Sequence, residues 1–418
     1  MRSQGSPNGR TLEQLIGSHV SGYSLERDFY VDEAIYRADI ERVWRRGWLF
    51  AGHSCEIADP GDYFTFELEN DSLIILRDDG GEAHAFHNVC RHRGMRLLGQ
   101  ESGHVNRIAC PYHQWIYGRD GSLLSCRGMH QIDTSVYGLR RLPVEEAAGL
   151  IFISLADPAG SFEPARALLD AMVAAQGLGH AKVAKVVDYE IGANWKLVWE
   201  NNRECWHCNA NHPQYIKANF DHYNLDDTPE RIKQQVAAVV ARSEAEWADA
   251  GLAVSYKQPG MTVFPDVDND VWFSTNRTAL AESYVSETMD GRQVAPLMGN
   301  YSGTSVGTLR IRTLPNFWNH SSCDHSVSTR LLPAGPQQTR ARVTWLVDKD
   351  AVEGKDYELE RLLPFWKLTS EQDWEICENQ QRGVRSSAYA PGPYSMYKEY
   401  NVNNFVCWYL KMMAMSAG

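Results

Sequence analysis

Short apolar runs separated by turn residues dominate the first third of the chain. Residues 73–78 (LIILRD), 83–88 (AHAFHN) and 104–109 (HVNRIA) are rich in the residue types that favour strands. Residues 117–121 (YGRDG) form a turn signal beyond them. This pattern predicts a β domain whose hairpin loops carry polar side chains.

A helical period replaces this pattern in residues 194–213 (NWKLVWENNRECWHCNANHP). Tryptophan and valine side chains follow one stripe at helical spacing, and a second face is predicted to carry Glu200, Glu204 and His207. Pro213 disfavours helical geometry at His212, so we expect the helix to end or bend there. Such a bend would turn His212 back toward the side of His207.

A second helix is predicted late in the chain, in residues 369–383 (TSEQDWEICENQQRG). Ser370 and Asp373 have the S-x-x-D spacing of a helix start, and Gly383 is a natural stop. Asp373 would then lie in the first turn. An acid there is usually only a partner of the helix dipole.

The composition is that of a globular protein. The chain has 418 residues, of which 43% are hydrophobic and 22% charged, and at about 150 residues per domain this predicts two or three ordered domains. The best apolar run, residues 149–156, is far shorter than the roughly 18 residues of a membrane span. The first ten residues lack the apolar core of a signal peptide. We therefore expect a soluble protein that does not act at a membrane.

The net charge and the cysteine content limit which binding partners and which cellular compartment we expect. Lys and Arg number 41 against 53 Asp and Glu, so the net charge is −12 and we expect no nucleic-acid partner. The nine cysteines are an odd number scattered over a long chain, which argues against a disulfide framework. We expect a cytoplasmic protein in which some cysteines bind metal and the others are buried thiols.

Two short clusters have the composition of metal ligands. Cys90 and His92 form a Cys-x-His cluster, and Cys110 and His113 form a Cys-x2-His cluster. A Rieske 2Fe–2S cluster needs two thiolates on one iron and two imidazoles on the other, and two such loops supply them. Structural zinc uses the same residue types but usually pairs Cys with Cys and His with His. Chance placement of buried side chains is the remaining alternative, and we favour the Rieske cluster.

A second set of residues has the composition of a mononuclear iron site. His207 and His212 would supply two imidazoles, and Asp373 is the best candidate for the carboxylate of a 2-His-1-carboxylate triad. Taken alone, two histidines near a helix end are more often structural. Downstream of a Rieske motif the iron interpretation gains strength, because the electron then has a destination. Cys205 and Cys208 also form a C-x2-C pair, but no thioredoxin-like βαβ pattern surrounds it, so we disfavour a redox dithiol.

These motifs together resemble the catalytic subunit of the Rieske non-haem iron oxygenases, over residues from about 25 to about 410. The finer resemblance is to the quaternary-ammonium branch, which includes glycine betaine, proline betaine and carnitine oxygenases. It rests on the segments FHNVCRHRG, ANWKLVWENNRECWHC, TWLVDKDAVEGKDYEL and SAYAPGPYS.

The resemblance implies an α+β fold, with a Rieske β domain and a helix-grip catalytic domain built on an antiparallel sheet. Residues 326–347 fit that sheet as a hairpin with a Pro-Ala-Gly-Pro turn. The expected division is an N-terminal helical lead-in (1–45), a Rieske 2Fe–2S domain (46–155) and a mononuclear non-haem Fe(II) domain (156–418).

The resemblance also implies a route for electrons. The family forms head-to-tail homotrimers, and by analogy His113 would face Glu204 of the partner subunit, which in turn holds a metal-bound histidine. Many family members have Asp at this bridge, and Glu204 supports the quaternary-ammonium branch. Because the chain has no convincing Gly-rich dinucleotide fingerprint, we expect NAD(P)H to deliver electrons through a separate reductase with flavin and a ferredoxin-type cluster.

The substrate class follows from the same resemblance. A trimethylammonium group has no hydrogen-bond donor and is recognised by cation–π contact with aromatic faces. Aromatic residues are concentrated in 256–272 and 317–318. We expect an O2-dependent monooxygenase that hydroxylates an N-methyl group of a betaine-like compound, releasing formaldehyde and the demethylated amine. The alternative is a Rieske oxygenase that hydroxylates an aromatic ring or a C–H bond of a non-ammonium substrate.

Overall fold

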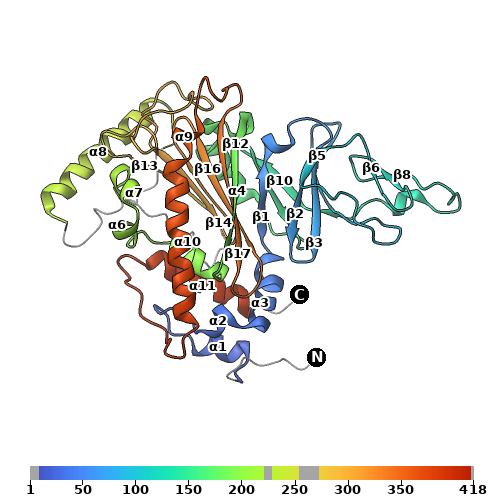
Figure 1. Ribbon diagram of the computed structural model, residues 1–418, viewed down its shortest axis with the longest axis horizontal. Helices are drawn as coiled ribbons and strands as arrows, with labels where there is room; N and C mark the ends of the chain where they lie inside the picture. The colour runs from blue at the N-terminus through green and yellow to red at the C-terminus, as the bar shows by residue number, and fades with distance from the viewer. Residues whose placement is uncertain (1–8, 221–227, 254–272, 416–418) are drawn as a thin grey trace.

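The computed structural model describes residues 9–220, 228–253 and 273–415 (Figure 1). Its α-helices are α1 (Leu12–Ser18), α2 (Asp28–Val31), α3 (Glu33–Asp39), α4 (Glu163–Met172), α5 (Trp195–Asn202), α6 (Cys208–Asn211), α7 (Pro213–Ala218), α8 (Glu230–Asp249), α9 (Leu359–Leu362), α10 (Pro364–Val384) and α11 (Tyr400–Ala414). Shorter 3-10 and π turns lie at Ile40–Trp44, Ser54–Ile57, Thr134–Val136, Ala174–Gln176 and Leu178–His180. No helix in these ranges is long and apolar enough to cross a membrane.

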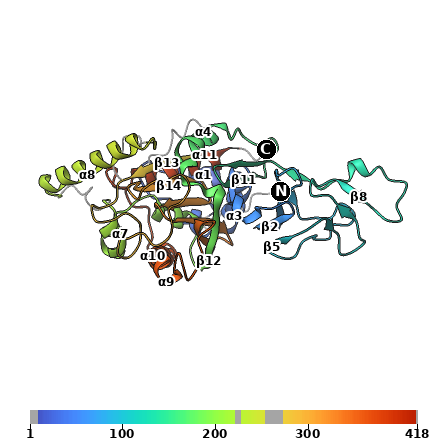
Figure 2. The ribbon, with the colours of Figure 1, turned by 90° about the horizontal axis from the view of Figure 1, so that it is seen from above.

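The strands of the N-terminal half form three small antiparallel sheets. Their bounds are β1 (Trp48–His53), β2 (Asp62–Leu68), β3 (Asp71–Arg77), β4 (Ala83–His87), β5 (Ser102–His104), β6 (Ile108–Ala109), β7 (Ile116–Tyr117), β8 (Leu123–Ser125), β9 (Arg141–Leu142), β10 (Val144–Ala147) and β11 (Leu150–Ser154). The sheet orders are β1-β11-β10, β5-β2-β3-β4-β9 and β6-β7-β8. The short β6–β8 hairpins lie at one end of the long axis of the molecule in both views (Figures 1 and 2).

The C-terminal half is built on one larger antiparallel sheet. Its strands are β12 (Ala181–Ile191), β13 (Phe273–Thr278), β14 (Thr308–Thr313), β15 (Phe317–Ser321), β16 (Ser326–Pro333) and β17 (Thr339–Asp348). Within the described residues their order is β12-β17-β16-β15-β14-β13. Successive side chains of a strand point to opposite faces. On one face Phe317 stacks on Phe50 of β1 at 3.9 Å between ring centroids, so this face packs against the N-terminal half.

The other face of this sheet is covered by α5 and α10. One core continues from α5 into the N-terminal helices and α11, and Trp44 and Trp195 meet edge to face at 5.4 Å in it. Lys196 and Asp39, both fully buried, form an ion pair in the same region. The N-terminal helices therefore support the segment that carries the candidate metal ligands.

Most predicted elements are present, with three corrections. The strands predicted at 73–78 and 83–88 are confirmed as β3 and β4, and the hairpin at 326–347 as β16 and β17. The single strand predicted at 104–109 is wrong, because β5 ends at His104 and β6 begins at Ile108.

The two predicted helices also differ from the sequence expectation. The helix of 194–213 ends at Asn202 and continues as two short helices, whose junction is at His212 as expected. The helix predicted at 369–383 begins earlier, because Pro364 supplies a favourable first residue, so Asp373 lies in the middle of α10 rather than in its first turn.

Candidate metal centres

The first candidate centre lies on two loops with the same backbone geometry. The Cys90 loop joins β4 to β5, and the Cys110 loop joins β6 to β7. In each loop the cysteine N–H donates to the carbonyl five residues later, at 2.8 Å, and the residue four positions later donates back to the cysteine carbonyl. That residue is Gly94 in the first loop and Gln114 in the second, and both have a positive φ (78° and 59°). The backbone thus holds each cysteine inside a closed turn.

These loops bring all four predicted cluster ligands together. The rings of His92 and His113 are 4.6 Å apart between centroids, and Trp115 stacks on His92 at 5.0 Å. Cys90 and Cys110 are buried side by side beneath them, and burial raises the pKa of the Cys90 thiol. The Nδ1 atom of His92 is buried without a hydrogen-bond partner in the described structure. A bound metal would satisfy that nitrogen, so the donor set fits an iron–sulfur cluster.

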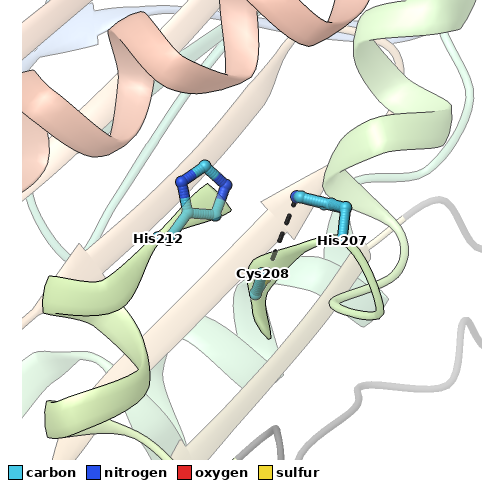
Figure 3. A group of neighbouring side chains, drawn as sticks. All are labelled: His207, Cys208 and His212. Carbon is cyan, nitrogen blue, oxygen red and sulfur yellow. Dashed lines mark hydrogen bonds between the residues drawn. The ribbon is translucent and has the colours of Figure 1, made fainter. Parts of the chain in front are cut away.

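The second candidate centre forms where the chain breaks between helices. His207 immediately precedes α6 and His212 follows it, and Figure 3 shows both beside the same space with Cys208 between them. Asp373 reaches this space from α10. Its Oδ1 lies 3.3 Å from His207 Nε2 and 2.9 Å from His212 Nε2. The structure thus brings together all three predicted triad residues.

A second partner fixes the orientation of each imidazole. His207 Nδ1 lies 2.5 Å from Glu204 Oε1, and His212 Nδ1 lies 2.8 Å from Gln372 Oε1. Each contact leaves Nε2 directed toward Asp373, which is the arrangement that metal-binding histidines usually have. Burial lowers the pKa of His207, but hydrogen bonds with Asp373 and Glu204 outweigh it and raise that pKa to about 10. Two nitrogens and one carboxylate oxygen converge here, so the donor set fits a divalent iron.

Glu204 and His207 are adjacent, but not on one helix face as predicted. The helix ends at Asn202, and the Glu204 carboxylate accepts hydrogen bonds from the N–H groups of Trp206 and His207, the latter at 3.4 Å. Glutamate therefore closes the turn that follows α5. An acid that caps a turn competes with continuation of the helix. The helical periodicity of the sequence did not reveal this helix end.

The expectation that the cysteines that do not bind metal are buried thiols also needs correction. Cys205 and Cys208 form a disulfide across the turn that contains His207, with Cα atoms 5.0 Å apart. The C-x2-C spacing brings the two side chains together because the chain turns there instead of extending. The other seven cysteines are free thiols, including Cys90 and Cys110.

The second centre opens into a cavity between the sheet and α10. Its walls include Glu204, His207, His212, Asp373, Tyr215, Trp318, Trp366, Trp374, His320, Arg310 and Arg312. Trp318 belongs to the predicted aromatic concentration at 317–318, whereas the concentration at 256–272 lies outside the described residues. The sequence interpretation missed Gln372 and the two arginines. The alternation TLRIRT in β14 was the available signal, since it places two charged side chains on one face of a buried strand.

Comparison with known proteins agrees with this geometry. Residues 47–138 match the Rieske [2Fe-2S] domain family, and residues 178–415 match the catalytic domain of ring hydroxylating alpha subunits. The chain belongs to the Rieske non-haem iron oxygenases. It is an alpha subunit with a Rieske 2Fe–2S domain and a non-haem iron catalytic domain, as expected.

Relatives of this oxygenase alpha subunit narrow its position in the family. It is 40% identical to the glycine betaine monooxygenase oxygenase subunit of Chromohalobacter salexigens over 405 residues, which are 96% of this chain and 87% of that protein. It is 38% identical to the subunit of the same name from Pseudomonas aeruginosa (strain UCBPP-PA14), over 99% of this chain and 94% of that one. The fold is similar to that of a quaternary ammonium Rieske monooxygenase, with a TM-score of 0.70 and 20% identity over 96% of this chain and 98% of that chain.

Proposed function

We propose that this alpha subunit is a monooxygenase that removes an N-methyl group from a small quaternary ammonium compound. The observation that carries the proposal is the convergence of His207, His212 and Asp373 at a cavity lined by three tryptophans. Tryptophan faces attract a cation that cannot donate hydrogen bonds. The names of the relatives support the same substrate class.

The reaction balances with O2 and two electrons. One oxygen atom is inserted into a C–H bond of the N-methyl group to give N–CH2OH, and the other leaves as water after two electrons and two protons are added. The hydroxymethyl group then loses formaldehyde and a proton, and the C–N bonding electrons stay on the tertiary amine. Bound iron would supply the O2 chemistry, while the protein excludes bulk water and presents the methyl group beside the triad.

We assign the metal ligands on the same basis. Cys90, His92, Cys110 and His113 would hold the 2Fe–2S cluster, and His207, His212 and Asp373 the mononuclear iron. This assignment supports the expected division into a lead-in (1–45), a Rieske domain (46–155) and a catalytic domain (156–418). In the structure β11 ends at Ser154 and α4 begins at Glu163, so the second boundary falls between elements.

We also propose a homotrimer in which electrons pass between subunits. The loops of the first centre and helix α7 of the second lie toward opposite ends of the long axis (Figures 1 and 2). Glu204 lies near the surface beside the exposed Trp206, and Tyr112 is exposed next to His113. Meeting of these two surfaces would bring His113 of one subunit to Glu204 of the partner subunit. Electrons would enter from NAD(P)H through a separate reductase, which is consistent with a cytoplasmic location.

The function is tested by measuring products with a surrogate flavin and iron–sulfur reductase. We expect one formaldehyde per O2 consumed with at least one of glycine betaine, proline betaine, carnitine and choline. The Asp373→Asn variant is the matched control, because it removes the triad carboxylate without touching the cluster loops. Absence of formaldehyde from all four compounds, together with diol formation from aromatic compounds, would overturn the proposal.

The assembly is tested by light scattering on the purified protein. We expect three times the mass of one chain for the wild type and a smaller particle for Trp206→Lys. A wild-type monomer that transfers electrons normally would contradict the inter-subunit route.

A further inference from the structure

The disulfide between Cys205 and Cys208 lies against the mononuclear centre. Cys208 Sγ is 3.8 Å from His207 Nε2, and Figure 3 shows Cys208 between the two histidines. One nitrogen of His207, one nitrogen of His212 and the Cys208 sulfur all lie within 4.8 Å of one another. A sulfur atom is therefore placed among the nitrogen donors, and its bond to Cys205 keeps it from acting as a thiolate.

The disulfide is not needed to hold the turn in which it lies. It links residues three positions apart, and such a short loop is the case in which a disulfide stabilises least. Hydrogen bonds close the same turn: the Glu204 carboxylate accepts from the Trp206 N–H, and the His212 N–H donates to the Cys208 carbonyl at 2.9 Å. Glu204 also contacts His207 Nδ1. Reduction of the disulfide would therefore free two thiols without removing the contacts that place the histidines.

The donor atoms match a tetrahedral zinc site once the sulfur is a thiolate. Asp373 Oδ1 lies 3.3 Å from His207 Nε2 and 2.9 Å from His212 Nε2. With metal–ligand bonds of about 2.0–2.3 Å, neighbouring donor atoms of a tetrahedral zinc are about 3.3–3.6 Å apart, close to these distances and to that of Cys208 Sγ from His207. Thiolate with imidazole favours zinc, whereas iron that activates O2 uses two imidazoles, one carboxylate and open positions. Cys208 would thus turn an open site of three donors into a closed site of four.

The charge of the metal favours the same change. Zinc and ferrous iron each carry two positive charges, and the Asp373 carboxylate neutralises one of them. A thiolate on Cys208 neutralises the second, so the metal and its direct ligands have no net charge, which costs less free energy in a site removed from water. Zinc also binds a given set of nitrogen and sulfur ligands more tightly than ferrous iron does. The reduced chain should therefore favour zinc.

We propose that Cys205 and Cys208 form a reversible redox pair that decides which metal the mononuclear centre holds. With the disulfide formed, the centre has the three donors of an iron site and is open to O2 and substrate. With the disulfide reduced, Cys208 is a fourth ligand and the centre holds zinc, which has no redox chemistry. The inference rests on the proposed function, because it uses the ligands assigned there: His207, His212 and Asp373.

The steps balance with small-molecule reagents. Two thiol molecules reduce the disulfide and become a disulfide themselves, and each cysteine sulfur gains one electron and one proton. Zinc then displaces the thiol proton of Cys208, which passes to water. Hydrogen peroxide reverses the change: one sulfur becomes a sulfenic acid as water leaves, and the second thiol displaces another water to form the S–S bond and release zinc. The half-buried Cys205 borders the cavity, so reagents of this size reach it.

The zinc affinity of two matched variants tests the redox pair. Cys205→Ala and Cys208→Ala both lack the disulfide, but only Cys205→Ala keeps the sulfur beside the histidines. The protein would keep its 2Fe–2S cluster, lose the mononuclear metal to a chelator, and be titrated with Zn2+ against a chromophoric chelator. The wild type would be titrated in two states, after stoichiometric hydrogen peroxide and after reduction by a phosphine that is then removed.

We expect Cys205→Ala and the reduced wild type to bind zinc about 100- to 1,000-fold more tightly than Cys208→Ala and the oxidised wild type. One ligand supplies roughly a quarter of the free energy of a four-ligand zinc site, which gives this ratio. Zinc should also slow alkylation of Cys208 in Cys205→Ala, as measured by mass spectrometry of the peptide that contains it.

Equal zinc affinities of the two variants would mean that the disulfide only braces the turn, and would overturn the proposal. Free thiols at both positions in the peroxide-treated wild type would also overturn it. If a variant does not fold, the two states of the wild type give the same comparison.

Failure of the proposed function gives a different result. Asp373→Asn should weaken zinc binding in every form, because it removes the triad carboxylate. If it does so while Cys205→Ala and Cys208→Ala have equal affinities, the triad stands and the redox pair is wrong. If the two variants differ as expected but no quaternary ammonium compound yields formaldehyde, the redox pair stands and the proposed reaction is wrong.

Discussion

The two candidate metal centres of this chain are assembled in different ways. The cluster centre is made from two loops that are each shaped by their own backbone hydrogen bonds, with ligands separated only by residues 93–109. The mononuclear centre needs a side chain from α10, and His212 and Asp373 are 161 positions apart in the chain. The first centre is therefore local and the second depends on tertiary packing. Variants that affect one centre and not the other test this difference.

The largest difference in effect between the two centres is expected from His207→Ala. The variant removes one of two imidazoles of the mononuclear centre but leaves both cluster loops unchanged, so formaldehyde release should fall to background. The brown colour and the EPR signal of the reduced cluster should persist. His180→Ala, at an exposed histidine outside both centres, is the control and should keep full activity. Retained activity in His207→Ala would remove this residue from the iron site.

The opposite result, loss of the cluster with the mononuclear centre kept, is expected from Cys110→Ala. Loss of one thiolate should abolish the cluster absorption and EPR signal, while iron still binds at the mononuclear centre. Cys126→Ala is a matched control, because Cys126 is a free, half-buried cysteine of the same region. If the two variants gave the same spectrum, Cys110 would not be a cluster ligand.

An intermediate effect is expected at Glu204, through which electrons would pass from one centre to the other. Glu204→Gln keeps the shape of the side chain that contacts His207 Nδ1 but removes its charge. Both metals should remain bound, and electron transfer to the mononuclear centre should slow by about 10- to 100-fold in single-turnover measurements. Transfer at the wild-type rate would rule out a bridging role for this glutamate.

A smaller effect, limited to the mononuclear centre, is expected from Gln372→Leu. His212 Nδ1 would lose its acceptor at 2.8 Å, so the ring would be less well oriented and iron affinity should drop by about 10-fold. The cluster spectrum should not change. Gln380→Leu alters an exposed glutamine on the same helix and controls for the helix itself. Equal iron affinity in both variants would show that Gln372 does not support the ligand.

The contrast between the centres also explains what the sequence predicted. The proposed cluster ligands and the strands β3 and β4 follow from local spacing and composition, which act within one loop or hairpin. The helix break at His212 was predictable because Pro213 restricts the residue before it. Asp373 was identified as a candidate acid, but its place in the middle of α10 was not, since Pro364 and not Ser370 begins that helix.

Other features of the mononuclear centre depend on more than local spacing. The end of α5 at Asn202 depends on the Glu204 carboxylate capping the next turn, and the disulfide between Cys205 and Cys208 follows from that turn. The placement of Arg310 and Arg312 in the cavity lining depends on strand register, which sets Arg312 opposite Trp318. Cross-strand pairing is decided by the whole sheet and cannot be deduced from one strand.

The smallest effect is expected from Glu200, which lies in the packing behind the mononuclear centre. Glu200 is buried on α5, accepts a hydrogen bond from Tyr30 Oη at 2.8 Å, and burial raises its pKa to about 7 from the usual 4.5. Between these pH values the folded protein holds a proton that the unfolded chain has lost, so stability falls as pH rises through the window. Glu200→Gln lacks this titration, and the loss of unfolding free energy between pH 5 and pH 8 should be smaller by about 2–3 kcal/mol than in the wild type. Denaturant unfolding at both pH values measures it, with Glu190→Gln, an exposed glutamate on β12, as the control. Parallel losses in Glu200→Gln and the wild type would mean that this carboxyl is ionised in the folded protein, and that the support of α5 does not depend on pH.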